Sequence, residues 1–99
     1  MSETIDDLTI AFSEDGIETI KELDKQVLSK GAWTTILFRY QEWKKAKQKY
    51  SPTKYSIRRY QKRNNQYSMK SKFNISSADQ ARKIIEVLNE WLALPEGGN

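Results

Sequence analysis

The side chains best suited to binding a ligand are concentrated in one stretch, residues 54–76, which reads KYSIRRYQKRNNQYSMKSKFNIS. This stretch contains seven lysine or arginine residues, several aromatic residues and no acidic residue. Lysine and arginine neutralise phosphate groups, and aromatic rings offer flat surfaces on which nucleobases stack. Cations and rings that alternate in one segment are therefore typical of a surface that binds single-stranded nucleic acid.

The charge of the chain is divided unevenly along the sequence. Residues 25–75 contain fourteen lysines and arginines and a single acid, Glu42, although the whole chain has a net charge of only +4. Residues 1–24 contain eight acids and one lysine, and residues 76–99 contain four acids and two cations. A cationic excess of this size favours a polyanionic partner for the middle segment over a surface that is charged only for solubility.

The residue types on which most enzymes depend are missing. The chain has no histidine and no cysteine, which excludes the commonest general base, the thiol nucleophile and the usual zinc ligands. The acids near the N-terminus could in principle hold a metal ion, but a solvated tail, or one that competes with nucleic acid, explains them better. We therefore expect a non-enzymatic protein with no metal and no cofactor.

Length and hydropathy limit the architecture and the compartment. The 99 residues are enough for one domain with one modest core. No apolar run approaches the ~20 residues that a membrane-spanning helix needs. The first ten residues, MSETIDDLTI, are acidic, unlike a signal peptide. We expect a soluble cytoplasmic protein without a membrane partner, and association with the nucleoid is an option.

The clearest element is a helix in residues 76–94, SSADQARKIIEVLNEWLAL. Ser77 and Gln80 have the spacing of a capping box, and Pro95 ends the segment. Apolar residues recur at three- and four-residue spacing and share one face of the helix: Ala78, Ala81, Ile84, Ile85, Leu88, Trp91 and Leu92.

Three segments before this helix read as strands. Residues 32–43, 54–62 and 67–75 are rich in β-branched and aromatic residues, and the RNNQ sequence at 63–66 predicts a tight turn between the last two. An antiparallel sheet followed by one amphipathic helix is an α+β arrangement. Residues 17–27 remain ambiguous, because their apolar residues have helical spacing but the segment could equally be extended.

Alternation along the strands predicts which side chains share a face. One face would pack beneath the helix, with these apolar residues: Ile36, Phe38, Tyr40, Tyr55, Ile57, Tyr67, Met69, Phe73 and Ile75. The opposite face would carry cations interleaved with two rings: Arg39, Arg58, Lys62, Lys70, Lys72, Trp43 and Tyr60. This second face is the predicted binding surface.

Plainer roles compete with binding at several of these positions. Lysines on exposed strands often serve only to prevent edge-to-edge aggregation. This role explains Lys47 and Lys49 as well as contact with a ligand does. The rings of Trp43 and Tyr60 could instead stabilise the sheet as cross-strand partners. Binding is favoured for these two rings because each has cations on its own predicted face.

The order of the motifs LSKGAW, KYSIRRY and SKFNIS resembles that of the positive cofactor four family of single-stranded-DNA-binding transcriptional coactivators. The resemblance covers roughly residues 20–94. It implies a curved four-stranded antiparallel sheet, a C-terminal helix and a homodimer whose sheets form the nucleic-acid channels. It also implies that residues 20–29 are the first strand.

The resemblance assigns roles to individual residues. The arginine and the stacking aromatic of the family match Arg58 and Tyr60. The aromatic-then-lysine stretch at the end of the second strand matches Trp43, Lys44 and Lys45. In some members the stacking ring is a tryptophan one residue later, where this chain has Gln61.

Together these patterns predict an acidic extension at residues 1–16, a nucleic-acid-binding domain at 17–94 and a tail at 95–99. The predicted function is largely sequence-tolerant binding of single-stranded DNA, with a role in transcription regulation. The alternatives are an adaptor that docks an acidic protein and a module that binds RNA. The predicted contact residues are Arg39, Trp43, Lys44, Lys45, Arg58, Tyr60, Lys62, Lys70 and Lys72.

Overall fold

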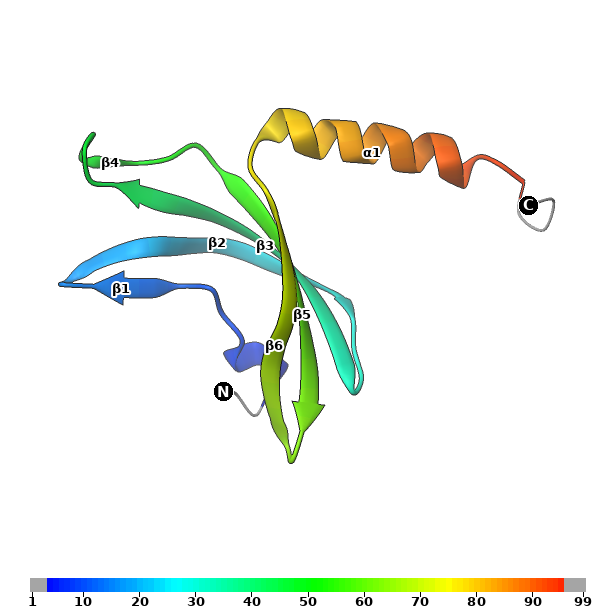
Figure 1. Cartoon of the computed structure of the whole chain (residues 1–99), viewed down its shortest axis with the longest axis horizontal. Helices are drawn as coiled ribbons and strands as arrows, with labels where there is room; N and C mark the ends of the chain where they lie inside the picture. The colour runs from blue at the N-terminus through cyan, green and yellow to red at the C-terminus, as the bar shows by residue number, and fades with distance from the viewer. Residues whose placement is uncertain (1–3, 96–99) are drawn as a thin grey trace.

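The computed structural model describes residues 4–95 as a curled antiparallel sheet followed by one helix (Figure 1). The sheet order is β1-β2-β3-β5-β6, with β4 paired to the end of β3. The elements are η1 (Ile5–Asp7), β1 (Phe12–Glu14), β2 (Ile17–Ser29), β3 (Trp33–Lys44), β4 (Lys49–Tyr50), β5 (Lys54–Arg63), β6 (Gln66–Ile75) and α1 (Ala78–Leu92).

The α+β fold class is confirmed, but the strand count is not. Four strands are long, as expected, and the short strands β1 and β4 bring the total in the described part of the chain to six. Strand β1 belongs to the predicted acidic extension at residues 1–16, where it pairs with β2. The predicted tail at residues 95–99 lies outside the described residues except for Pro95.

Strand β2 is extended although its apolar residues have helical spacing. Its pairing with β3 shifts register between Glu22 and Asp24, and again between Val27 and Ser29. A β-bulge of this kind changes which face the following residues occupy. Ile20 and Val27 therefore pack against the same core although they are seven residues apart, which explains the misleading spacing in the sequence.

Tight turns join the hairpins as the composition predicts. Asn64 and Asn65 connect β5 to β6 with φ values of 52° and 63°. Positive φ at both central residues is typical of a type I′ turn, which suits the twist of the flanking strands. The predicted turn at residues 63–66 is thus confirmed.

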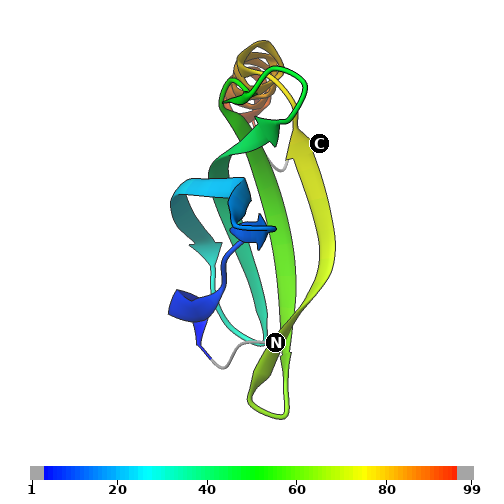
Figure 2. The same cartoon turned by 90° about the vertical axis from the view of Figure 1, so that its left-hand side faces the viewer.

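The hydrophobic core lies on the side of the sheet that does not face the helix. It consists of Leu8, Ile10, Ile36, Phe38, Tyr40, Tyr60 and Tyr67. We call this side the core face. Residues 4–11 cover part of it, on one side of the curled sheet (Figure 2).

The other side, the helix face, carries Leu37, Tyr55, Ile57 and Ile75 next to the first turns of α1. The prediction that Ile36, Phe38 and Tyr40 pack beneath the helix is therefore wrong. In the register between β3 and β5, Phe38 lies opposite Ser56, whereas Leu37 lies opposite Ile57. Both faces of β3 carry apolar residues, so only the register shows which set lies under the helix.

A second bulge moves part of β6 to the opposite face. Arg59 pairs with Ser71 but Tyr60 pairs with Met69, so Lys70 is the extra residue. Tyr67 consequently joins the core face, whereas Ile75 borders the helix. Strict alternation had placed these two residues together.

Helix α1 begins where the capping residues predict. The Ser77 hydroxyl accepts a hydrogen bond from the Gln80 amide at 3.1 Å, and the Gln80 side chain accepts one from the Ser76 amide at 3.0 Å. Only the first part of the helix lies against the sheet, and the rest extends beyond it (Figure 1). The expected burial of the whole apolar face is therefore not found in the single chain.

Candidate nucleic-acid interface

Arg58 lies at the middle of the core face. Strand β5 places it between Ile36 on β3 and Lys72 on β6. The guanidinium donates to the Ser56 hydroxyl at 3.3 Å and approaches the Met69 sulfur at 3.8 Å. No carboxylate of the described residues lies within ion-pairing distance of this partly buried cation. Its positive charge therefore has no acidic partner within residues 4–95.

Polar side chains continue from Arg58 across β5 and β6. The Ser56 hydroxyl is fully buried and donates to the Asn74 side-chain oxygen at 2.7 Å. Lys72 is exposed and lies directly across the strand pair from Arg58. These side chains form a cationic strip with hydrogen-bonding groups at the border of the apolar core.

Two tyrosines lie close enough to Arg58 for its charge to affect them. Burial raises the pKa of Tyr60, and the charge of Arg58 opposes this rise. Burial also raises the pKa of Tyr40, with a further rise from Glu42 and opposing effects of Lys54 and Arg58. Because both phenols titrate above their ordinary range, they stay neutral near pH 7 and do not compensate the charge of Arg58.

Glu42 is the acid that interrupts the basic middle segment, and it is already paired. Its carboxylate lies 2.5 Å from the Lys54 ammonium and 3.5 Å from that of Lys44. The hydrogen bond from Lys54 holds the pKa of Glu42 below its ordinary value, against the opposing effect of burial. The same hydrogen bond raises the pKa of Lys54. Glu42 therefore reduces the charge available from Lys44, one of the predicted contacts.

This pairing predicts an acid-sensitive contribution to stability. A carboxylate with a lowered pKa in the folded state stabilises the protein above its unfolded pKa, and this stability is lost as the pH falls through the folded value. Between about pH 6 and pH 3, we expect the wild-type free energy of unfolding to fall by more than that of Glu42→Gln, measured in urea. Glu86→Gln is the control, because the Glu86–Lys83 pair is mostly exposed. Equal losses in wild type and Glu42→Gln would contradict the prediction.

The structure separates the nine predicted contact residues. Arg58, Tyr60, Lys62 and Lys72 share the core face. Tyr60 is only 5% exposed, because it belongs to the core. The predicted open ring beside Arg58 is thus covered in this conformation.

Arg39 and Trp43 do not lie with these four residues. Arg39 pairs with Tyr55, so it lies on the helix face. Trp43 follows it on the same face by alternation, and its ring edge contacts Tyr50 at a centroid distance of 5.1 Å. The expectation that Arg39 and Trp43 share one face with Arg58 is therefore wrong, because it rested on the wrong face of β3.

The remaining predicted cations are exposed at the ends and edges of the sheet. Lys44 ends β3, Lys45 follows in the turn before β4, and Lys70 is the bulge residue of β6. Arg59 lies opposite Thr35 on the helix face and stacks on the Trp33 ring at 4.2 Å. No ion pair within residues 4–95 joins Arg59 to an acid.

Two residues of the core face, Tyr67 and Lys25, were not predicted as contacts. Lys62 lies 5.4 Å above the Tyr67 ring, so Tyr67 combines a ring with a cation. Lys25 is partly buried and donates to backbone carbonyls of residues 4–11. Neither could be found by alternation, since each follows a bulge or lies in the segment whose structure was ambiguous.

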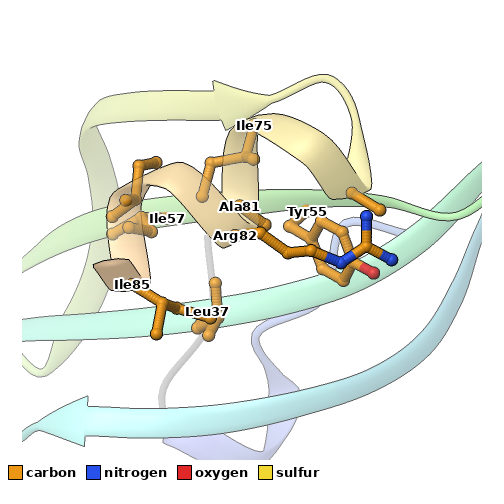
Figure 3. Close-up of a pocket in the computed structure, with 9 residues that line it drawn as sticks. Leu37, Tyr55, Ile57, Ile75, Ala81, Arg82 and Ile85 are labelled. Carbon is orange, nitrogen blue, oxygen red and sulfur yellow. The ribbon is translucent and has the colours of Figure 1, made fainter. Parts of the chain in front are cut away.

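An apolar pocket of about 410 Å³ opens between the sheet and the first turns of α1 (Figure 3). Leu37 and Ile57 line it from the sheet, and Ala81 and Ile85 from the helix. Further along the helix, Leu88, Trp91 and Leu92 are 48%, 64% and 77% exposed. An apolar groove and an apolar helix face thus lie next to each other on the same chain.

Residues 4–95 contain neither a cluster of metal-ligating side chains nor a helix that could span a membrane. No group of three or more acidic, histidine or cysteine side chains is placed to hold a metal ion there. No helix in this part of the chain is both long and apolar enough to cross a membrane.

Comparisons of the chain with protein-family models, curated proteins and solved structures yield no match. The resemblance to the positive cofactor four family therefore stays a prediction from the sequence motifs.

Proposed function

We propose that the protein is a non-enzymatic, largely sequence-tolerant single-stranded-DNA-binding protein that binds through the core face of its sheet. The observation that carries this proposal is Arg58, a partly buried cation without an acidic partner among the described residues. A charge held away from water is costly unless an opposite charge compensates it. A phosphate at this position would supply that charge and would also reach Lys72 across the strand pair.

The other cations support a polyanionic ligand. Among the described residues, Lys44 is the only predicted contact residue found in an ion pair. Within residues 4–95, the predicted cations without an ion pair are Arg58, Lys62 and Lys72 on the core face, Lys45 and Lys70 at the end and edge of the sheet, and Arg39 on the helix face. Unpaired cations release counterions when they bind phosphates, which favours association. Transcription regulation is the process that the sequence resemblance implies for such binding.

The helix favours single strands over duplex DNA as the ligand. Major-groove readers usually present a basic helix to the duplex. In the described part of the chain, the cations of α1 are Arg82 and Lys83, which pair with Asp79 at 2.8 Å and Glu86 at 3.3 Å. Lys62, Lys70 and Lys72 are exposed on β5 and β6 and form no ion pair within residues 4–95. An extended strand can follow them there.

The proposed assembly is a homodimer in which two copies cover each other's apolar helix faces. Large exposed apolar surfaces mark interaction sites, and the exposed residues of α1 adjoin the groove in Figure 3. A two-fold axis brings the same patch of each subunit together. The helix end of one copy could then fill the groove of the other, which would bury both surfaces at once.

The function is tested by titrating fluorescently labelled dT of ~15 nucleotides into the full chain at several salt concentrations. Four engaged phosphates would make log affinity fall with log salt at a slope of roughly −3. Duplex DNA and oligo-U of the same length, and polyglutamate, are titrated in parallel. We expect the tightest binding to dT. Preference for polyglutamate would indicate the adaptor, preference for oligo-U an RNA-binding module, and preference for duplex would contradict the proposal.

A further inference from the structure

The N-terminal segment covers rings on the face proposed to bind DNA. We call residues 4–11 the strap. Its two buried apolar side chains, Leu8 and Ile10, are 4% and 6% exposed and belong to the same cluster as Tyr60 and Tyr67, and Ile5 packs against this cluster. Figure 2 shows this dark-blue segment beside the curled sheet, apart from its strand ladders. The strap thus occupies the positions where bases would reach the tyrosine rings.

The hydrogen bonds that attach the strap to the sheet come from side chains of β2. The Lys25 ammonium donates to the carbonyls of Ile5, Asp6 and Leu8 at 3.0, 3.1 and 2.7 Å. The Glu22 carboxylate accepts from the Thr9 hydroxyl at 2.6 Å and from the Ile10 amide at 3.3 Å.

No backbone–backbone hydrogen bond joins residues 4–11 to the rest of the described chain, since strand pairing begins at Phe12. Backbone ladders are the cooperative part of a sheet, and all of them lie outside the strap. The strap can therefore leave the core face while the strand pairing stays intact.

The strap also carries the same sign of charge as a phosphate backbone. Asp6 and Asp7 form no ion pair within the described residues. Asp6 lines an open pocket together with the cations Lys30 and Lys62 and the Tyr67 ring. The strap places acidic side chains beside cations, and apolar side chains in the cluster that contains the aromatic rings. A single strand of DNA would bring the same two features to the sheet, namely negative charge and groups that pack on rings.

We propose that the strap is an internal competitor, and that single-stranded DNA displaces it and takes its place on Tyr60 and Tyr67. This inference rests on the proposed function. Lys25, released from the three carbonyls, then becomes a phosphate contact on the core face, where it lies opposite Phe38. The apparent affinity of the full chain for DNA is then the affinity of the open form multiplied by the fraction of molecules in which the strap is open.

The direct test follows the Leu8 and Ile10 methyl groups by NMR during titration of the full-length protein with dT of ~15 nucleotides. We expect both methyl signals to move to positions typical of disordered chain as binding saturates. Saturable binding with both signals unchanged would overturn the strap proposal and leave the proposed function standing. If dT produces no change in anisotropy or in any signal, the proposed function fails and the strap proposal fails with it.

A variant pair tests the competition independently. The double substitution Leu8→Ala and Ile10→Ala loosens the strap without altering a strand, and we expect it to tighten dT binding by at least about fivefold. Phe12→Ala is the matched control, because this apolar side chain follows the strap and is 56% exposed; its affinity should equal that of wild type. Unchanged or weaker binding by the double variant, with its strand signals intact, would overturn the proposal.

Discussion

Arg58→Gln is expected to weaken binding of dT by roughly ten- to a hundredfold. A hydrogen bond to a charged group contributes about 1.5–3 kcal/mol, and each 1.4 kcal/mol corresponds to about tenfold in affinity. Arg58 is partly buried on the core face and has no acidic partner within residues 4–95. Loss of one phosphate contact should also make the dependence of log affinity on log salt shallower by about 0.7.

The neighbouring residue supplies the matched control for Arg58. Arg59→Gln removes the same charge, but Arg59 points to the opposite face, where it stacks on Trp33 at 4.2 Å. We expect its affinity to stay within about twofold of wild type, as for a charge outside the contact surface. Circular dichroism of both variants checks that the sheet is retained. If Arg59→Gln weakens binding as much as Arg58→Gln does, binding through the core face is wrong.

Leu88→Glu combined with Trp91→Glu is expected to convert the proposed dimer into a monomer of 11.6 kDa. Both side chains are about half exposed or more in the single chain, at 48% and 64%. In the proposed dimer they are buried, so two carboxylates there would lose their hydration without gaining partners. Sedimentation equilibrium over a range of concentrations measures the change in mass.

The control for this experiment alters the other side of the same helix. Glu86→Gln combined with Glu90→Gln changes the helix charge by the same number of units but leaves the apolar stripe intact. This variant should keep the wild-type mass. A wild-type protein that sediments as a monomer at all concentrations would contradict the homodimer. The same result would leave α1 with an exposed apolar surface that needs a different partner.

The comparison of sequence and structure shows why whole elements were easier to predict than faces. Ser77 and Gln80 form their predicted cap, and Asn64 and Asn65 form the predicted turn, because both depend on contacts within a few residues. The face occupied by Tyr67 depends instead on the extra residue Lys70 in β6. A bulge is a property of the pairing between two strands, and no single strand sequence specified it.

The predicted grouping of side chains on one face of the sheet was correct only in part, for the same reason. Arg58, Tyr60 and Lys72 point to one face, away from α1, as alternation along β5 and β6 required. Arg39 was assigned to that face through the choice of Ile36, Phe38 and Tyr40 as the set under the helix. Strand β3 carries apolar residues on both faces, so alternation did not show which face lies under the helix. The register with β5 places Leu37, and not Phe38, on the helix face.

The sequence alone showed the concentration of positive charge in residues 25–75 and the absence of histidine and cysteine. It was also sufficient to predict the three later strands and the start of the helix. These features follow from composition or from contacts between residues close in the chain. Three-dimensional packing was needed to show that Leu8 and Ile10 share a core cluster with Tyr60, that Glu42 is paired and that the C-terminal part of α1 extends beyond the sheet. Each of these depends on residues distant in sequence, whose contacts are set by strand register, bulges and sheet curvature.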